Sequence, residues 1–242
     1  MVKPMELAER FVTTMAGELE GGLRSALVYG SVARGDAIPG VSDVNILLLL
    51  DSVTMETLEQ LSPLARGWAE QGNTAPLLLD WESWGRAADV FSVEVSDMLE
   101  HRRLIRGEDP LDGVRVQPRS LRAQTERELR GKLIQLHEGL LLAAPEPDRV
   151  GELLLAALPS FATYFRATLR LAARPVPATT PETIAATAVL VGGDAGAFQE
   201  AWQARAQGHA PALRPTDGTV RGYYALVQRV TEHVDRLLEE TQ

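Results

Sequence analysis

The sequence contains no cysteine among its 242 residues. This absence excludes a disulfide framework, a zinc site built on thiolates and a cysteine nucleophile. Histidine is scarce as well, with four residues, and no two of them have the spacing of metal ligands. A histidine-based metal site is therefore not expected. The absence of cysteine agrees with a reducing compartment.

Long apolar segments are missing too. The longest apolar run, Val44–Leu50, is interrupted by Asn45 and is far shorter than the ~20 residues that span a bilayer. The N-terminal segment lacks the apolar stretch of roughly 7–15 residues that marks a secretory signal. We therefore expect a cytoplasmic protein without a membrane partner.

Positive charge is in the minority. The chain has 24 Lys and Arg residues against 33 Asp and Glu residues, which gives a formal net charge of −9. An acidic surface repels nucleic acid unless its basic residues cluster. The arginine-rich stretches Arg102–Arg106 and Arg115–Arg130 lie among acidic residues and are interpreted as solvated surface. No nucleic-acid partner is expected.

In the N-terminal half, apolar periodicity predicts strands alternating with helices. Amphipathic helices are predicted over residues 5–20 and over Thr54–Gln71. The apolar runs Leu23–Tyr29 and Val44–Leu50 predict central strands of a sheet that is covered by helices on both faces. Shorter strands are predicted at Pro76–Leu79, Phe91–Val95 and Arg103–Arg106.

After Pro118 the pattern is helical throughout. Helices are predicted at Leu121–Ala143, Arg149–Ala173, Pro181–Val191, Ala195–Ala206 and Thr219–Glu240. Pro159, near the middle of the second of these, predicts a kink or a break. The predicted fold class is α+β: a mixed sheet flanked by helices in a domain over residues 1–115, followed by an all-helical domain over residues 116–242.

The residues with the clearest chemical signal follow the first strand. Gly30 permits close backbone approach, and Ser31 offers a hydroxyl and an N–H at the expected start of a helix, which suits phosphate oxygens. After a loop, Asp43 stands at the entry of the buried strand. Asn45 is two residues further on, so both side chains project to the same face. Carboxylates at such positions would hold Mg²⁺ beside a triphosphate.

This pattern resembles the polymerase-β-type nucleotidyltransferase superfamily, whose motif is a Gly-Ser pair, a loop, and then Asp-x-Asp/Glu on a strand. The resemblance covers about residues 20–110 and is carried by Gly30-Ser31, the Ala-Arg-Gly-Asp sequence at 33–36 and Ser42-Asp43. The helical half is similar in architecture to the helical domains of small bacterial members, including aminoglycoside nucleotidyltransferases. The resemblance implies transfer of a nucleoside monophosphate from a Mg²⁺-bound nucleoside triphosphate, expected to be ATP, to a hydroxyl of a small molecule or a protein.

The sequence departs from the family at Asn45, where the motif has its second acid. The resemblance implies that Asp43 and Asn45 are the metal ligands. An Asn oxygen can coordinate Mg²⁺, but it removes one unit of charge from a site that acts mainly by electrostatics. Either Asn45 is the remainder of a lost ligand, or its amide is an adapted part of the site that donates a hydrogen bond to Asp43 or to phosphate.

A third acid, which would ligate metal or serve as the base, has three candidates. Asp80 follows the Pro76–Leu79 strand, Glu82 lies just beyond it, and Glu94 lies on the predicted strand Phe91–Val95. Each could equally be a helix cap or a solvated acid, and Asp80 precedes Trp-Glu-Ser in a pattern that is typical of an N-cap.

The resemblance implies that the nucleotide is contacted by Gly30, Ser31, Arg34 and Lys132. Arg34 could reach phosphate, or it could pair with Asp36 or Glu94. Lys132 lies on the first helix of the C-terminal half. It could face the nucleotide, or it could form a surface pair with Glu128, four residues before it.

Two hypotheses about function remain open at this point. The chain is either a nucleotidyltransferase or a degenerate homologue that binds a nucleotide or a partner protein without chemistry. Asn45 favours the second, whereas Gly30, Ser31 and Asp43 favour nucleotide binding under both. An antitoxin-like role beside a helical toxin rests on fold analogy alone. The sequence leaves the acceptor and the oligomeric state open.

Overall fold

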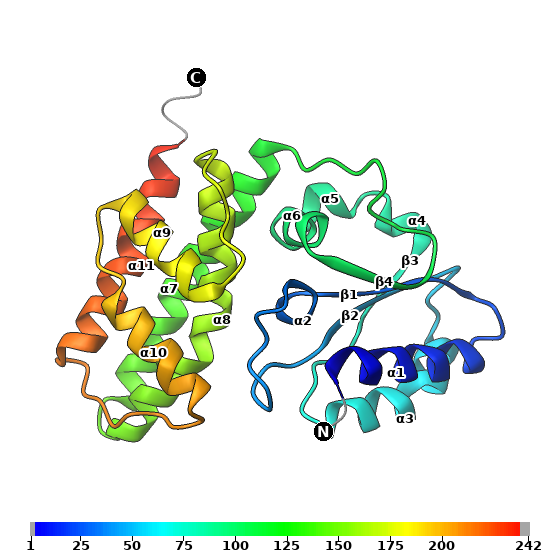
Figure 1. Ribbon diagram of the computed structural model, residues 1–242, viewed down its shortest axis with the longest axis horizontal. Coiled ribbons are helices and arrows are strands. Elements are labelled where there is room, and N and C mark those ends of the chain that lie inside the picture. The colour runs from blue at the N-terminus through cyan, green and yellow to red at the C-terminus, as the bar shows by residue number, and fades with distance from the viewer. Residues whose placement is uncertain (1–2, 238–242) are drawn as a thin grey trace. The chain divides into compact units, whose positions relative to one another are not determined.

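A computed structural model describes residues 3–237 of the chain. The chain divides into two compact units, Met1–Gln117 and Pro118–Gln242 (Figure 1). The first unit contains the sheet and the second is helical. Within residues 3–237, no helix has both the length and the apolar character that a membrane crossing requires.

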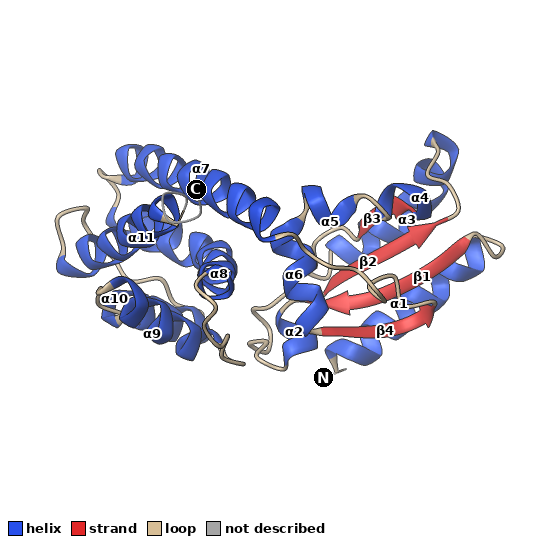
Figure 2. Cartoon of the chain, turned by 90° about the horizontal axis from the view of Figure 1, so that it is seen from above, coloured by secondary structure: helices blue, strands red, loops and turns tan. Residues whose placement is uncertain are grey.

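The first unit is a four-stranded mixed sheet flanked by helices (Figure 2). Its strands are β1 (Leu23–Tyr29), β2 (Asn45–Leu50), β3 (Leu77–Asp80) and β4 (Arg102–Gly107). They lie in the order β3-β2-β1-β4, with β1 antiparallel to both β2 and β4, and β2 parallel to β3. The helices are α1 (Pro4–Glu18), α2 (Ser31–Arg34), α3 (Met55–Ala69), α4 (Trp81–Trp84), α5 (Ala87–Val90) and α6 (Ser92–Glu100).

Strand β2 is buried on both faces of the sheet. Ile46, Leu48 and Leu50 pack in one core with residues of α1 and α3. Leu47 and Leu49 pack in a second core with residues of α4 and α6. Because successive side chains of a strand point to opposite faces, a strand with a core on each side needs an almost unbroken aliphatic sequence. The predicted central strand is confirmed.

The prediction of a strand at Phe91–Val95 is wrong. These residues lead into the helix α6, where Val95 and Met98 are buried against the sheet and Leu99 packs in the same core. The spacing of these three residues is helical, and it outweighs the short alternation that begins at Phe91. Glu94 therefore lies in the first turn of α6 instead of on a strand.

The second unit consists of five helices among the described residues: α7 (Pro118–Ala143), α8 (Pro147–Leu171), α9 (Thr180–Val191), α10 (Gly196–Ala206) and α11 (Gly218–Arg236). The predicted helices are confirmed. The last of them was predicted to reach Glu240, and its final three residues lie outside the described part of the chain. The core contains Phe161, Phe165, Phe198 and Tyr223, and the rings of the last two stack with their centroids 3.7 Å apart.

Helix α8 continues through Pro159 without a break. Proline has no N–H, so the carbonyl of Leu155, four residues earlier, has no donor within the helix. Arg205 of α10 supplies one, with its Nη1 donating to that carbonyl at 3.1 Å. The predicted break is absent, and the carbonyl that proline leaves without a donor joins α8 to α10.

Candidate functional site

Gly30 ends β1 and precedes α2. Its φ of 74° and ψ of −150° fall in a region that is essentially restricted to glycine. A Cβ at this position would lie 3.1 Å from Nδ2 of Asn45, so the amide would have to shift by a few tenths of an ångström. Glycine is therefore required by the backbone turn, and it also leaves room for the Asn45 side chain.

The turn that follows is closed by backbone hydrogen bonds around Ser31. The N–H groups of Gly35 and Asp36 both donate to the Ser31 carbonyl, at 2.9 and 3.1 Å. Gly35 has a left-handed conformation, with φ of 85°, which ends the helix. Ser31 thus occupies a fixed position directly after β1.

Ser42 closes the loop that leads to Asp43. Its Oγ accepts a hydrogen bond from the N–H of Ile38 at 2.9 Å, and its own N–H donates to the Ile38 carbonyl at 2.9 Å. This reciprocal pair holds the end of the loop at the start of β2. The serine that precedes Asp43 therefore has a structural role that brings the carboxylate to the sheet.

Asn45 and Tyr29 lie on one face of the sheet. Asn45 is two residues before Leu47 and four before Leu49, so it shares their face, and it is paired with Tyr29 in the β1–β2 ladder. Tyr29 packs in the core on that side. This is the face that α6 covers.

Two acids act electrostatically on Tyr29, which is paired with Asn45 in the β1–β2 ladder. Burial, and then the negative charges of Glu94 and Asp43, raise the pKa of Tyr29 to about 12. Both carboxylates are thus close enough to the Tyr29 hydroxyl for their charges to act on it. The structure brings Asp43, Asn45 and Glu94 together at the same end of the sheet, next to Gly30.

Two residues that the sequence analysis did not single out, Asn73 and Thr74, bond to the start of β2 from the side of β3. Oδ1 of Asn73 accepts the N–H of Val44 at 3.0 Å, and the Thr74 hydroxyl donates to Oδ1 of Asn45 at 3.2 Å. The indole N–H of Trp68 donates to the Thr74 carbonyl at 3.0 Å. The available signal was two polar residues shortly before a predicted strand.

Arg34 is buried in an ion-pair network. Its Nη1 lies 2.7 Å from Oδ2 of Asp97 and its Nε lies 3.3 Å from Oδ1 of Asp36, and none of the three side chains is more than 8% exposed. Of the roles considered for Arg34, pairing with Asp36 is observed, and Asp97 of α6 takes the place expected of Glu94. The guanidinium joins α2 to α6, and a contact between Arg34 and a phosphate stays a prediction.

Asp80 lies at the other end of the sheet. It is opposite Leu50 in the β2–β3 ladder, five residues from Asn45, or about 16 Å along the strand. Its Oδ1 accepts the N–H of Ser83 at 2.7 Å, and this bond, with one from the Ser83 hydroxyl, lowers the pKa of Asp80. Asp80 caps α4, and we leave it out of the candidate site.

Lys132 belongs to the helical unit, on α7. The surface pair with Glu128 is absent from the part of the chain that the structure describes. One carboxylate oxygen of Glu128 lies 3.5 Å from Arg127, and the other accepts the Tyr164 hydroxyl at 3.5 Å. A contact between Lys132 and a nucleotide stays a prediction.

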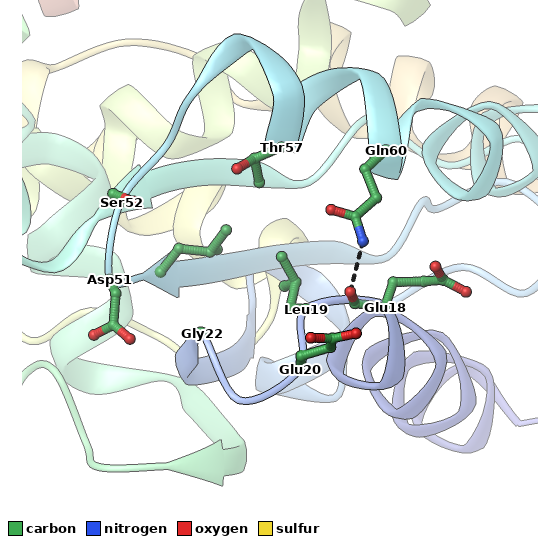
Figure 3. Close-up of a pocket in the computed structure, with 9 residues that line it drawn as sticks. Glu18, Leu19, Glu20, Gly22, Asp51, Ser52, Thr57 and Gln60 are labelled. Atoms are coloured by element: carbon green, nitrogen blue, oxygen red, sulfur yellow. Dashed lines mark hydrogen bonds between the residues drawn. The ribbon is translucent and has the colours of Figure 1, made fainter.

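A cavity of about 380 Å³ opens at the end of β2 opposite to Asn45 (Figure 3). Gln60 reaches across it, with Nε2 donating to the Glu18 carbonyl at 2.7 Å. None of the motif residues lines this cavity, whose lining consists of Glu18, Leu19, Glu20, Gly22, Leu50, Asp51, Ser52, Thr57 and Gln60. It is therefore separate from the candidate site.

The donor set suits a metal ion that arrives with a ligand. Among residues 3–237 there is no group of three or more His, Asp and Glu side chains arranged to hold a metal. Asp43 and Glu94 supply two carboxylates at one end of the sheet. Mg²⁺ is usually held by one or two carboxylates, with waters and substrate phosphates completing its shell. These residues fit a Mg²⁺ that is bound to a nucleotide, and they do not fit a metal held by protein side chains alone.

Comparison with known proteins supports the fold. No protein-family model and no curated protein matches the sequence. The chain is similar to spectinomycin adenyltransferase AAD(9) from Enterococcus faecialis, crystallised with ATP and spectinomycin. The TM-score is 0.60 at 10% identity, over 93% of this chain and 98% of that one.

A toxin-antitoxin structure with AMP-PNP is matched over 43% of this chain and 77% of that one, at 18% identity. Its TM-score is 0.31, too low to indicate a shared fold. The match to AAD(9) covers nearly the whole length of both chains. It shows that the two chains share a fold.

Proposed function

We propose that this chain is a nucleotidyltransferase that transfers AMP from Mg²⁺-bound ATP to a hydroxyl of a small molecule. The observation that carries the proposal is the position of Asp43, just before β2, at the end of the sheet where β1 leads into the Gly30-Ser31 turn, with Glu94 near enough to Tyr29 for its charge to act there. The fold is that of AAD(9), a protein crystallised with ATP and a small molecule, and the choice of ATP and of a small acceptor rests on this analogy.

Each residue of the site has a distinct task in this proposal. The Gly30-Ser31 turn receives the triphosphate, and Asp43 is the protein ligand of the cation. When bound, Mg²⁺ neutralises phosphate charge and favours departure of pyrophosphate. Glu94 accepts the proton of the acceptor hydroxyl as its oxygen attacks the α-phosphorus. The new P–O bond forms, the bond to the bridging oxygen breaks, and pyrophosphate leaves.

The degenerate homologue remains the second candidate, and two observations favour it. Asn45 stands where the family motif has an acid, and no three-ligand metal group occurs within residues 3–237. Such a protein would bind ATP or a partner protein and would release no pyrophosphate. The two candidates therefore differ in pyrophosphate release.

The test uses the purified full chain. Calorimetry measures ATP binding with and without Mg²⁺, and pyrophosphate release is then followed with spectinomycin and other polyhydroxylated small molecules as acceptors. Pyrophosphate release that depends on an acceptor supports the transferase. ATP binding without release for any acceptor supports the degenerate homologue. Absence of ATP binding contradicts the transferase and leaves only the protein-binding form of the degenerate homologue.

Variants separate the roles of the two acids. Asp43→Asn should abolish the part of ATP affinity that depends on Mg²⁺. Glu94→Gln should keep ATP binding and lower pyrophosphate release by about 10²–10⁴-fold, the usual contribution of a general base. Asp80→Asn is the matched control, because Asp80 is an acid of the same sheet that caps α4. It should leave both readouts unchanged.

A further inference from the structure

The side-chain amide of Asn45 has a defined orientation. Its Oδ1 accepts the Thr74 hydroxyl at 3.2 Å. Its Nδ2 lies on the side of Gly30, 3.1 Å from the place that a Cβ would occupy there. Thr74 precedes β3 and Gly30 follows β1, so these neighbours lie on opposite sides of β2. The amide oxygen faces the β3 side, and the amide nitrogen faces the Gly30-Ser31 turn.

The hydroxyl that fixes this orientation belongs to the folded scaffold. The Thr74 carbonyl accepts the indole N–H of Trp68 at 3.0 Å. Trp68 is 1% exposed and its ring stacks on Phe11, with the centroids 4.3 Å apart. The neighbouring Asn73 holds the N–H of Val44. Asn45 is therefore supported by a chain of contacts that begins in the core, which is unlike a position left over from a lost metal ligand.

Charge gives a reason for an amide at this position. Asp43 and Glu94 already place two negative charges around Tyr29. A carboxylate at position 45 would add a third, on the side that faces the turn. The triphosphate is itself negative, and like charges at short range repel strongly where water is partly excluded. The Asn amide nitrogen offers two N–H donors and no charge.

We propose that Asn45 is a phosphate-binding residue, whose Nδ2–H donates to a phosphate oxygen of the nucleotide at the Gly30-Ser31 turn. Its oxygen stays with Thr74 and does not ligate Mg²⁺. Of the two motif positions on the strand, only Asp43 would then ligate the cation. This inference rests on the proposed nucleotide site and adds to it the role of the residue that departs from the family motif.

The first test is calorimetry of ATP binding to the full chain, in Mg²⁺ and in a chelator, for wild type and Asn45→Asp. Asn45→Asp should weaken binding about tenfold or more in the chelator, since a donor to a charged phosphate is lost and a like charge is added. Mg²⁺ should not bring its affinity above that of the wild type. If Asn45 were a lost metal ligand, the variant would bind ATP more tightly in Mg²⁺, and this result would overturn the inference.

Asn45→Ala is the second variant, because it removes the donor without adding charge. It should weaken ATP binding both in Mg²⁺ and in the chelator, and unchanged affinity in the chelator overturns the inference. Thermal unfolding of each variant shows that the fold is retained. If wild type binds no ATP under either condition, the proposed function itself fails. Binding by wild type with an unaffected Asn45→Ala refutes this inference alone.

Thr74→Val tests the orientation of the amide. Valine has nearly the shape of threonine and lacks the hydroxyl, so the Asn45 amide is free to turn its oxygen toward the site. ATP affinity in the chelator should fall several-fold, and the gain on adding Mg²⁺ should increase. Thr13→Val is the matched control, because Thr13 is an exposed threonine of α1 whose hydroxyl donates to the Glu9 carbonyl. Equal ATP affinities for the two variants overturn the role of Thr74.

Discussion

At the scale of the residue, Gly30 has two separate reasons to lack a side chain. Its backbone conformation costs other residues about 1–3 kcal/mol, and a Cβ would displace the Asn45 amide. Gly30→Ala should therefore lower the free energy of unfolding by about 1–3 kcal/mol and also abolish ATP binding. Urea denaturation and calorimetry measure the two effects.

Gly35→Ala separates backbone strain from the contact with Asn45. Gly35 is left-handed, with φ of 85°, and a Cβ there would meet open space. The cost should be about 1–2 kcal/mol with ATP affinity retained. Loss of ATP binding in Gly35→Ala to the same extent as in Gly30→Ala would show that strain alone explains both.

The raised pKa of Tyr29 predicts a loss of stability at alkaline pH. The ordinary value is 10.0 and the folded value is about 12. As the pH rises above 10, the unfolded chain releases the proton first, so the stabilisation present below pH 10 declines until about pH 12. The expected loss from this group is about 1.4 kcal/mol at pH 11.

Urea denaturation near pH 9 and pH 11, for wild type and Tyr29→Phe, measures this loss. The phenylalanine variant should lose less stability over the interval, because it has no proton to release at this position. Tyr223, whose pKa burial also raises, is present in both proteins and cancels in the comparison. An identical pH dependence in the two proteins would contradict the prediction.

At the scale of the element, the buried ion pairs of Arg34 attach α2 to α6. Arg34→Met leaves the carboxylates of Asp36 and Asp97 in a buried setting without their cation, and this should cost about 3–5 kcal/mol. Adding Asp97→Asn should recover part of the loss, since the two side chains are in contact. Chemical denaturation of the single and double variants measures the coupling, and additive effects would argue against it.

The sequence predicted elements well where the pattern was long. The aliphatic run of β2 has one interpretation, because only a strand buried on both faces needs it. The five residues Phe91–Val95 fit a strand and a helix equally. The helical spacing can be recognised only when the segment is followed to Leu99. Glu94, predicted on that strand as a candidate third acid, lies in the first turn of α6.

For the candidate site, Gly30, Ser31 and Asp43 could be predicted because they belong to one local motif. Thr74 and Asp97 were missed because each meets its partner, 29 and 63 residues away, only after folding. Sequence spacing alone does not show which residues of two distant segments come into contact. For Thr74 the sheet order shows it, because it places the segment before β3 next to the start of β2.

At the scale of the whole molecule, the two units have separate cores. The helical unit buries Phe161, Phe165 and Phe198 with Tyr223, all of which lie after residue 117. A fragment of residues 118–242 should therefore unfold cooperatively on its own. Circular dichroism during heating measures this, with the full chain as reference. A broad transition without a baseline would mean that the helical unit needs the sheet unit to fold.

The contact between Arg205 and the Leu155 carbonyl also bears on the order in which Pro159 and Arg205 can arise by substitution during evolution. A proline at 159 that arose before the arginine would leave the Leu155 carbonyl without a donor, at a cost of about 1–3 kcal/mol. An arginine at 205 that arose first would be a half-buried side chain on α10 with no such cost. The path on which arginine comes first avoids this cost at each step, and once the proline is present, loss of the arginine incurs it.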